Sequence, residues 1–135
     1  MANTYTQLYI HIVFSVKGRE NKLNPANKEI LHKYITGIVR KRNIKMIAIN
    51  SMPDHMHIFL GLNPNISVSD TVRDIKHSSA NFINNQKWNS RKFYWQEGFG
   101  AFSYSHSHID SVVKYILEQE KHHKKKHLKR NIKNY

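Results

Sequence analysis

Hydrophobic and polar residues alternate with two different periods along this chain, and the change of period divides it into strands and helices. Residues 8–16 (LYIHIVFSV) are rich in β-branched and aromatic side chains and apolar at nearly every position. This composition predicts a central β-strand. After a polar loop at 17–22, Asn24 and Pro25 form a typical helix start. Apolar residues then recur at helical spacing as far as residues 40–43.

The middle of the chain predicts a β-hairpin followed by a second helix. Residues 44–52 and 55–62 both favour strands, and the Pro-Asp pair at 53–54 favours a turn between them. Ser67 and Asp70 form a pair similar to a capping box, which indicates the start of the second helix. The apolar residues at helical spacing in this helix are Val68, Val72, Ile75, Phe82 and Ile83.

The last part of the chain predicts one more strand and one more helix. Residues 93–105 favour a fourth strand, interrupted by Gly98 and Gly100. Ser107 and Asp110 form another capping pair before the final helix. The apolar stripe of this helix consists of Ile109, Val112, Val113, Ile116 and Leu117.

The predicted order of elements is β-α-β-β-α-β, followed by one extra helix. This order is that of the ferredoxin-like arrangement, an α+β fold with an antiparallel sheet in which the first and third strands are central. A length of 135 residues fits one domain, spanning 1–135 with a basic tail from about 121 to 135.

The charge balance indicates a polyanionic partner. The chain has 22 Lys and Arg against 9 Asp and Glu, which gives a formal net charge of +13. Nucleic acid is the first partner to consider for such an excess. The residues at 40–42 and the tail could instead be solvated helix ends, although the size of the excess favours phosphate contact. On charge, the candidate contacts in these clusters are Arg40, Lys41, Arg42, Lys124 and Lys125.

Membrane and disulfide chemistry are not expected. No apolar run approaches the roughly 20 residues that a bilayer span requires. The N-terminus lacks the basic and then apolar pattern of a signal peptide. Because the chain has no Cys, disulfides and thiolate sites are excluded. We therefore expect a cytoplasmic protein without a membrane partner.

Two histidines on one strand are candidate metal ligands. His55 and His57 are two residues apart, so on a strand their side chains point to the same face. Two imidazoles on one face can bind a single divalent ion. From spacing alone, a pair of half-buried histidines beside a turn is the more ordinary interpretation.

Tyr115 and Gln119 form a second pair of candidate residues. They are four apart on the final helix and therefore lie on one flank of it. At 100° per residue, Tyr115 lies about 130° from the centre of the apolar stripe, so packing is not its main purpose. A surface tyrosine is an equally good interpretation. A tyrosine hydroxyl is a poor nucleophile near neutral pH, and a metal that polarises a scissile phosphate lowers the barrier to its attack.

The residues that carry these patterns resemble a known family. Residues 52–60 (MPDHMHIFL) resemble the His-hydrophobe-His strand of HUH nucleases, and more closely that of the small transposases of the insertion-sequence 200/605 family. Residues 113–123 (VKYILEQEKHH) resemble the catalytic helix of those transposases, and 93–103 (FYWQEGFGAFS) the strand before it. Residues 11–19 (HIVFSVKGR) and 75–79 (IKHSS) resemble the first strand with its basic exit and a stretch of the second helix.

The resemblance implies a mechanism and a partner. It implies that Tyr115 is the nucleophile, that His55, His57 and Gln119 bind Mg²⁺ or Mn²⁺, and that attack gives a 5′-phosphotyrosine. The implied substrate is single-stranded DNA beside a subterminal hairpin. The implied assembly is a homodimer in which the His pair of one subunit commonly works with the Tyr helix of the other. The covalent bond keeps the phosphodiester energy, so no nucleotide cofactor is expected. By family position and charge, the candidate DNA contacts are Lys17, Arg19 and Lys76.

Three other functions remain open at this stage. A domesticated relative would use the same chemistry to process chromosomal hairpin repeats. A non-catalytic ferredoxin-like nucleic-acid-binding module would stack bases on sheet aromatics, and it would not need both residue pairs. A phosphohydrolase that uses water would normally offer more carboxylate ligands, and Asp54 is the only obvious carboxylate near the His pair.

Overall fold

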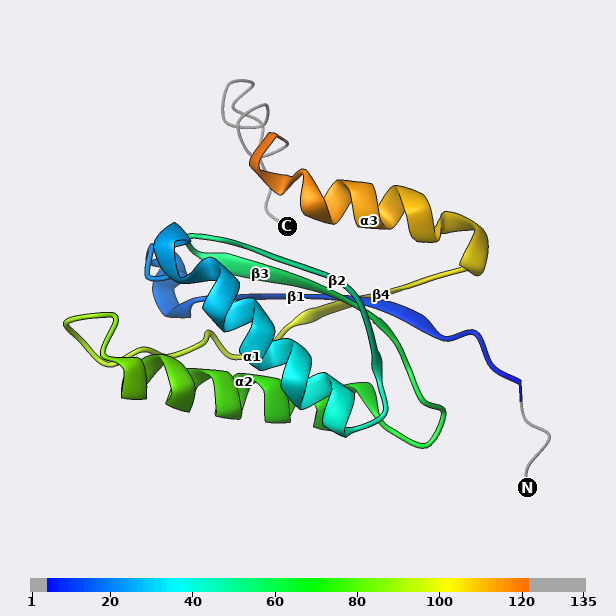
Figure 1. Ribbon diagram of the computed structural model, residues 1–135, viewed down its shortest axis with the longest axis horizontal. Helices are drawn as coiled ribbons and strands as arrows, with labels where there is room; N and C mark the ends of the chain where they lie inside the picture. The colour runs from blue at the N-terminus through cyan, green and yellow to red at the C-terminus, as the bar shows by residue number, and fades with distance from the viewer. Residues whose placement is uncertain (1–4, 122–135) are drawn as a thin grey trace.

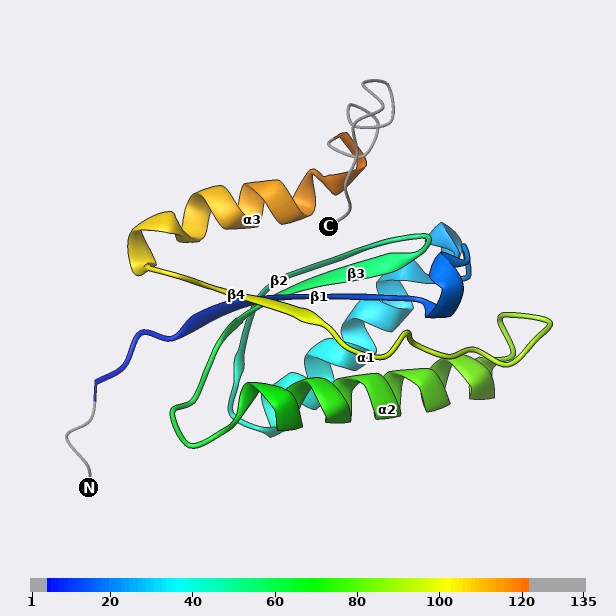
Figure 2. The same ribbon diagram turned by 180° about the vertical axis from the view of Figure 1, so that it is seen from behind.

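The computed structural model describes residues 5–121, and in that range an antiparallel four-stranded sheet carries helices on both faces (Figures 1 and 2). The strands are β1 (Tyr9–Ser15), β2 (Lys45–Met52), β3 (His55–Gly61) and β4 (Gly100–Tyr104). The helices are α1 (Lys28–Lys41), α2 (Val68–Gln86) and α3 (Ile109–Leu117). The strand order β2-β3-β1-β4 confirms the ferredoxin-like α+β prediction, with the first and third strands central.

The predicted starts of the first two helices are confirmed by their caps. The side chain of Asn24 accepts a hydrogen bond from the backbone N–H of Ala26, at 2.9 Å, and the 3₁₀ turn Pro25–Asn27 leads into α1. At the start of α2, the hydroxyl of Ser67 accepts from the backbone N–H of Asp70, at 3.0 Å. Each cap satisfies a backbone donor that the first helical turn leaves unpaired.

The two faces of the sheet bury different sets of residues. Met56, Ile58 and Leu60 belong to the main core, which lies between the sheet and the pair α1 and α2. A smaller core on the other face lies under α3 and consists of Ala48, Phe59, Val112 and Ile116. The alternation along β3 therefore places its two histidines on the α3 face, as the strand period of two requires.

The fourth strand occupies the last part of the range 93–105 in which it was predicted. Only Gly100–Tyr104 is strand, and a single bridge between Val16 and Trp95 represents the earlier part. At this bridge the N–H of Lys17 donates to the carbonyl of Tyr94 and the N–H of Gln96 donates to the carbonyl of Ser15. Side chains of α2 bind further backbone groups of residues 93–98. Asn84 accepts from the N–H of Phe93 at 2.7 Å and donates to the carbonyl of the same residue at 3.1 Å.

The start and the stripe of α3 also differ from the prediction. Ser107 does not cap the helix: its hydroxyl bonds to that of Ser105, at 3.0 Å, and His108 occupies the cap position without a side-chain cap bond. The reason is an extra 3₁₀ turn, His106–His108, ahead of the helix. Leu117 is 57% exposed, whereas Tyr115 packs against the smaller core. The helix thus presents Tyr115 to the sheet together with its apolar residues.

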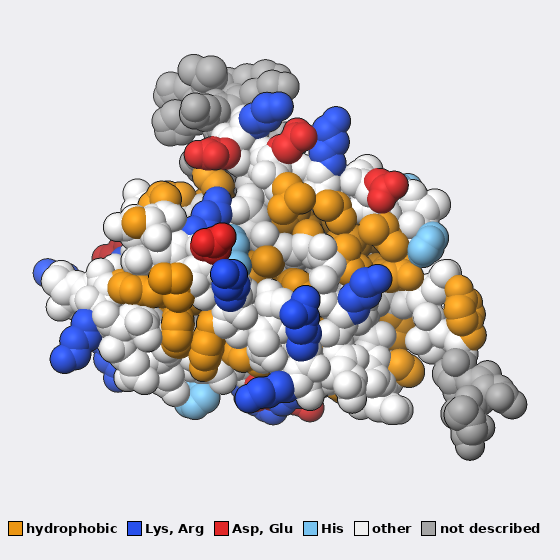
Figure 3. Space-filling view, viewed as in Figure 1, with side chains coloured by type: hydrophobic (Ala, Val, Ile, Leu, Met, Phe, Trp, Pro, Cys, Tyr) orange, Lys and Arg blue, Asp and Glu red, His pale blue; other side chains and the backbone are white. Residues whose placement is uncertain are grey.

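The surface that carries α1 shows many Lys and Arg side chains with few acidic ones between them (Figure 3). On the edge strand β4, Phe102 and Tyr104 are exposed. Within residues 5–121 no helix combines the length and the apolar character that a membrane crossing needs. Lys124 and Lys125 lie outside the described residues.

Candidate active site

β3 brings the two predicted metal ligands together on the face covered by α3. The ring centroids of His55 and His57 are 5.0 Å apart, with their planes at 74°. Both side chains are buried. In the strand register His55 lies opposite Met52 of β2, and His57 lies opposite Asn50. The prediction that the two imidazoles share a face is confirmed.

His55 is held by a carboxylate. The Nδ1 atom of His55 lies 2.7 Å from Oδ1 of Asp54, and Arg19 binds Oδ2 of the same carboxylate at 3.1 Å. Burial acts to raise the pKa of Asp54, but the hydrogen bond and charge of His55, together with Arg19, outweigh it and hold that pKa below its ordinary value. Asp54 is therefore ionised at neutral pH and accepts the Nδ1 proton of His55. Arg19, predicted as a DNA contact, lies at the outer end of this chain of contacts.

His57 is held by another histidine, which sequence reasoning did not select. Nε2 of His11 on β1 lies 2.9 Å from Nδ1 of His57. Their ring centroids are 5.1 Å apart. Burial lowers the pKa of His11 to about 4, so this imidazole is neutral at physiological pH. Its sequence signals are a polar residue inside an apolar strand and its place at the start of the stretch 11–19 that resembles the family's first strand.

α3 places Tyr115 over the histidines of its own chain. The Tyr115 ring centroid lies 6.0 Å from that of His57 and 6.3 Å from that of His11, both edge-on. Gln119, one turn further, is buried, and its amide nitrogen donates to the Tyr115 carbonyl at 3.1 Å. The helix is fixed by Asn50, whose amide donates to the carbonyl of Ile116 at 2.8 Å.

The donor types around His55 and His57 fit a divalent cation. Within residues 5–121 no group of three or more His, Cys, Asp or Glu side chains is arranged to hold a metal. A cation at the two imidazoles would therefore take another kind of third ligand. The carboxamide oxygen of Gln119 is of the right class, since nitrogen and oxygen donors together suit first-row divalent ions.

The other predicted DNA contacts lie in several places. Lys17 is exposed, with its ammonium 5.4 Å from the centroid of the Tyr94 ring. Lys41 is exposed at the end of α1, and Arg42 forms an ion pair with Asp74. These positions leave the predicted contacts with DNA untested.

Lys76 has a local structural partner. Its ammonium donates to the carbonyl oxygens of Gln96 and Gly98, at 2.7 and 2.9 Å. Burial lowers the pKa of Lys76, and the charge of Glu97 opposes that shift. Gly98 has a φ of +85°, a conformation that favours glycine. Lys76 therefore holds the turn that leads into β4.

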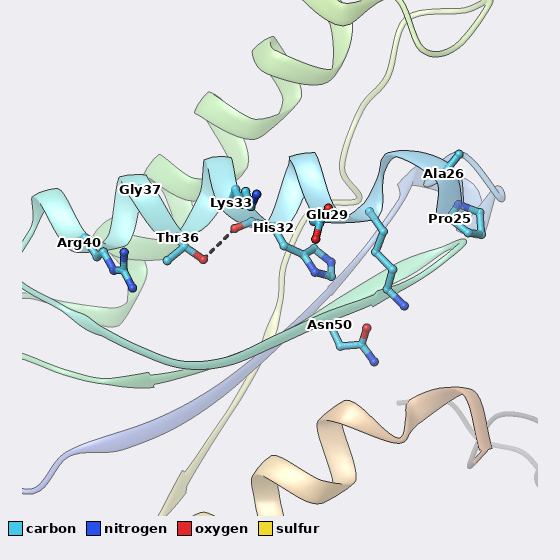
Figure 4. A pocket seen from close by; sticks show the side chains of 10 residues that line it. Pro25, Ala26, Glu29, His32, Lys33, Thr36, Gly37, Arg40 and Asn50 are labelled. Atoms are coloured by element: carbon cyan, nitrogen blue, oxygen red, sulfur yellow. Dashed lines mark hydrogen bonds between the residues drawn. The ribbon is translucent and has the colours of Figure 1, made fainter.

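A basic groove runs along α1 toward the site. It has a volume of about 760 Å³, and its charged lining residues are the cations Lys28, Lys33 and Arg40 and the carboxylate Glu29, with Asn50 on its far side toward α3 (Figure 4). A second cavity of about 320 Å³ shares Lys28 with this groove and extends to Asp54. Lys28 therefore lines both cavities, and Asp54 lines the second one.

Comparison with known proteins identifies the family. The sequence pattern described as "Transposase IS200 like" matches residues 4–119. The ISDra2 transposase TnpA of Deinococcus radiodurans is 24% identical over 120 residues, which cover 84% of each chain. The transposase for insertion sequence element IS200 of Salmonella typhimurium is 23% identical over 129 residues, which cover 90% of this chain and 84% of that protein.

Solved structures share the fold. A Deinococcus radiodurans protein crystallised as a candidate transposase superimposes with a TM-score of 0.70 at 21% identity, over 88% of this chain and 95% of that one. A REP-associated tyrosine transposase bound to a REP hairpin gives a TM-score of 0.66 at 20% identity, over 90% of this chain and 73% of that one. With the family pattern covering most of its length, this chain belongs to the IS200-like transposase family.

Proposed function

We propose that this chain cleaves and rejoins single-stranded DNA at hairpin-flanked element ends through a 5′-phosphotyrosine intermediate on Tyr115. The observation that carries the proposal is the position of the Tyr115 ring, 6.0 Å from that of His57, which itself lies beside His55. A half-buried tyrosine over two buried imidazoles is an arrangement suited to phosphoryl transfer. It is not needed by a module that only binds nucleic acid.

The reaction exchanges one phosphate ester for another. The Tyr115 oxygen forms a bond to the scissile phosphorus, and the bond between phosphorus and the 3′ oxygen breaks. The tyrosine loses its hydroxyl proton, and the departing oxygen gains one and becomes a free 3′-OH. The phosphate stays on the 5′ oxygen of the downstream strand. Attack by a 3′-OH on the phosphotyrosine reverses these steps, so joining requires no nucleotide cofactor.

His55, His57 and Gln119 are the residues that would hold Mg²⁺ or Mn²⁺. A bound divalent cation would supply positive charge to the scissile phosphate. Nδ1 of each imidazole contacts a neighbouring side chain, Asp54 at His55 and His11 at His57. Gln119 is held close to the nucleophile because its amide nitrogen bonds to the Tyr115 carbonyl.

Hairpin DNA is the proposed substrate for two reasons. One solved structure with the same fold is described as bound to a REP hairpin. The net charge of +13 and the cations of the α1 groove provide positive potential for a polyanion. Lys17, Lys41 and the tail residues Lys124 and Lys125 are further proposed phosphate contacts. We also propose that the protein works as a homodimer.

The test is a labelled cleavage assay. Single-stranded DNA carrying a candidate element end is incubated with the protein and Mg²⁺, labelled at its 3′ end in one sample and its 5′ end in another. The proposed polarity predicts that only the 3′-labelled strand becomes attached to protein. Tyr115→Phe should abolish the adduct and leave hairpin binding within a few-fold, since it removes only the nucleophilic oxygen.

Tyr104→Phe is the matched control, because Tyr104 is an aromatic residue on the same sheet face. It should retain the adduct. An adduct that persists in Tyr115→Phe would assign the attack to another residue and refute the proposed nucleophile.

A further inference from the structure

The two candidate metal ligands are held through the same ring atom by different partners. Nδ1 of His55 is bound by the carboxylate of Asp54, at 2.7 Å. Nδ1 of His57 is bound by Nε2 of His11, at 2.9 Å. Histidines that bind metals usually donate their other ring N–H to an acceptor that fixes the tautomer and the ring orientation. Asp54 is a common kind of acceptor in this position, and His11 is an unusual one.

We propose that His11 is a positioning residue that holds His57 in the tautomer with its proton on Nδ1, which directs Nε2 toward the metal. The inference rests on the proposed function, since it takes His57 as a ligand. It assigns to His11 a role toward His57 and no contact with DNA or metal.

The direction of the hydrogen bond follows from counting protons. A neutral imidazole carries one proton, on either Nδ1 or Nε2. Because Nδ1 of His57 faces His11, only Nε2 of His57 can serve as the ligand atom, and a ligand nitrogen must be unprotonated. The proton of His57 is then on Nδ1 and is donated to His11. Nε2 of His11 must accept, which places the proton of His11 on its own Nδ1.

The surroundings of His11 keep this bond dry. His11 is only 4% exposed. Its ring lies among those of Phe102, Tyr104 and Tyr115, with centroids 6.1 to 6.4 Å away. Water therefore cannot readily replace His11 as the acceptor, and a buried hydrogen bond is costly to leave unmade. A neutral acceptor also adds no buried charge beneath the nucleophile, whereas a second carboxylate would.

Removing the acceptor should release the tautomer of His57. In His11→Leu, Nδ1 of His57 loses its partner, and the Nε2–H form, which free imidazole side chains favour, becomes populated. That form cannot bind a metal through Nε2 without first moving its proton. In His11→Gln, the side-chain oxygen reaches the former position of Nε2 and can accept. In His11→Asn, the amide reaches only the position of Nδ1.

The experiment measures the tautomer directly in the metal-free, DNA-free full chain. Imidazole ¹H–¹⁵N correlation spectra of uniformly labelled protein report which nitrogen of His57 carries the proton. We expect Nδ1–H in the wild type and in His11→Gln, and a mixture in His11→Leu and His11→Asn. His32→Leu, which removes a different partly buried histidine bonded to Ser51, should leave the His57 signal unchanged.

A Mn²⁺ titration gives a second readout. Mn²⁺ affinity should fall about 10-fold or more in His11→Leu, the range for loss of such a partner, and stay within a few-fold in His11→Gln. Backbone amide spectra check that each variant is folded, and His11→Gln against His11→Asn decides the question if His11→Leu does not fold.

Two results would overturn the inference. One is a wild-type His57 protonated on Nε2, or a tautomer that no His11 variant changes. The other is a His11→Gln protein with the tautomer intact but Mn²⁺ binding as weak as in His11→Leu, which would make His11 a ligand. The tautomer is measured without DNA or metal. A failed cleavage assay therefore does not change the conclusion about His11, and an unexpected tautomer does not change the conclusion about cleavage.

Discussion

The side-chain amide of Asn50 on β2 donates a hydrogen bond to the backbone carbonyl of Ile116 on α3, at 2.8 Å. Asn50 is also the cross-strand neighbour of His57. One buried amide therefore connects the strand pair that carries the histidines to the helix that carries Tyr115, one residue before Ile116. The relative position of nucleophile and candidate ligands depends on this bond and on a small apolar core.

Asn50→Ala should loosen α3 more than it destabilises the whole fold. The substitution removes two buried hydrogen bonds, the one to the Ile116 carbonyl and the one that Asn50 Oδ1 accepts from the backbone N–H of Ser51. Loss of each costs about 1 kcal/mol, which makes about 2 kcal/mol together. We expect a decrease of that size in the free energy of unfolding, measured with urea, and faster amide hydrogen exchange confined to 109–117. Asn81→Ala, at an exposed position of α2, is the control. Unchanged exchange in α3 would show that the apolar core alone fixes the helix.

Asp54→Asn should weaken metal binding without removing a ligand. The neutral amide cannot give His55 the negative partner that the carboxylate supplies, and loss of such partners lowers metal affinity by about 10-fold to 100-fold. His55→Ala, His57→Ala and an excess of chelator should each eliminate cleavage. The measurements are Mn²⁺ titration and strand cleavage, with Asp110→Asn at an exposed position of α3 as control. Full activity in excess chelator would contradict the metal assignment.

The α1 groove should contribute to the salt dependence of DNA binding. Each phosphate that Lys or Arg neutralises contributes about −0.7 to the log–log slope of single-strand affinity against salt. If Lys33 and Arg40 each contact one phosphate, the Lys33→Gln Arg40→Gln protein should have a log–log slope that is about 1.4 less steep than that of the wild type. Lys87→Gln with Arg91→Gln, two exposed cations just beyond the C-terminal end of α2, is the matched control. Equal slopes in both variants would place the DNA elsewhere.

Sequence patterns predicted most of this fold because local chemistry sets its elements. The alternation of polar and apolar residues along β3 fixed which side chains face α3, and Asn24 and Ser67 marked helix starts that the structure has. The fourth strand was predicted only as lying within 93–105, because residues 93–99 also have strand-like composition. Their backbone makes one bridge with the end of β1 and is also bound by the side chains of Asn84 and Lys76, which lie on α2.

The candidate site was predicted only in part, for a related reason. His55 and His57 share a strand, and Tyr115 and Gln119 share a helix segment, so spacing reveals each pair. His11 and Asn50 belong to the site through cross-strand register, which spacing within one segment does not show. Leu117 was wrongly assigned to the buried face of α3. The sheet surface under this helix includes imidazoles, and Tyr115 packs against them.

Stability should fall as the pH is lowered from about 6.5 to about 4. Burial lowers the pKa of His11 to about 4, and burial with the nearby Lys28 charge does the same to His32. Between those values the unfolded chain binds more protons, so the free energy of unfolding decreases with falling pH, by up to about 1.4 kcal/mol per pH unit for each histidine. The depressed pKa of Asp54 affects the free energy of unfolding only at pH values below this window.

Urea unfolding at pH 7 and pH 5 measures this effect. His32→Gln should reduce the difference between the two pH values, and by less than the full amount because His32 is partly exposed. His77→Gln, at an exposed position of α2, should leave the difference unchanged. A wild-type stability that does not differ between the two pH values would contradict the assignment.

The last prediction concerns the exchange of α3 between subunits. In the structure α3 packs on its own sheet through a small core, with four buried residues and partly buried ones around them, and through the Asn50 bond. An equivalent sheet in a second subunit would offer α3 the same contacts. A dimer that shares its sites predicts complementation. When a His55→Ala His57→Ala protein is mixed with a Tyr115→Phe protein, the Tyr115 helix of the first can join the intact histidines of the second, and part of the cleavage activity should return. If each site is confined to one chain, cleavage cannot return, because every subunit in the mixture carries either the His or the Tyr substitution.

Differently tagged subunits measure the exchange of subunits itself. Efficient exchange without recovered cleavage would make the own-chain arrangement of Tyr115 and His57 the catalytic one, and the tyrosine chemistry would be unaffected.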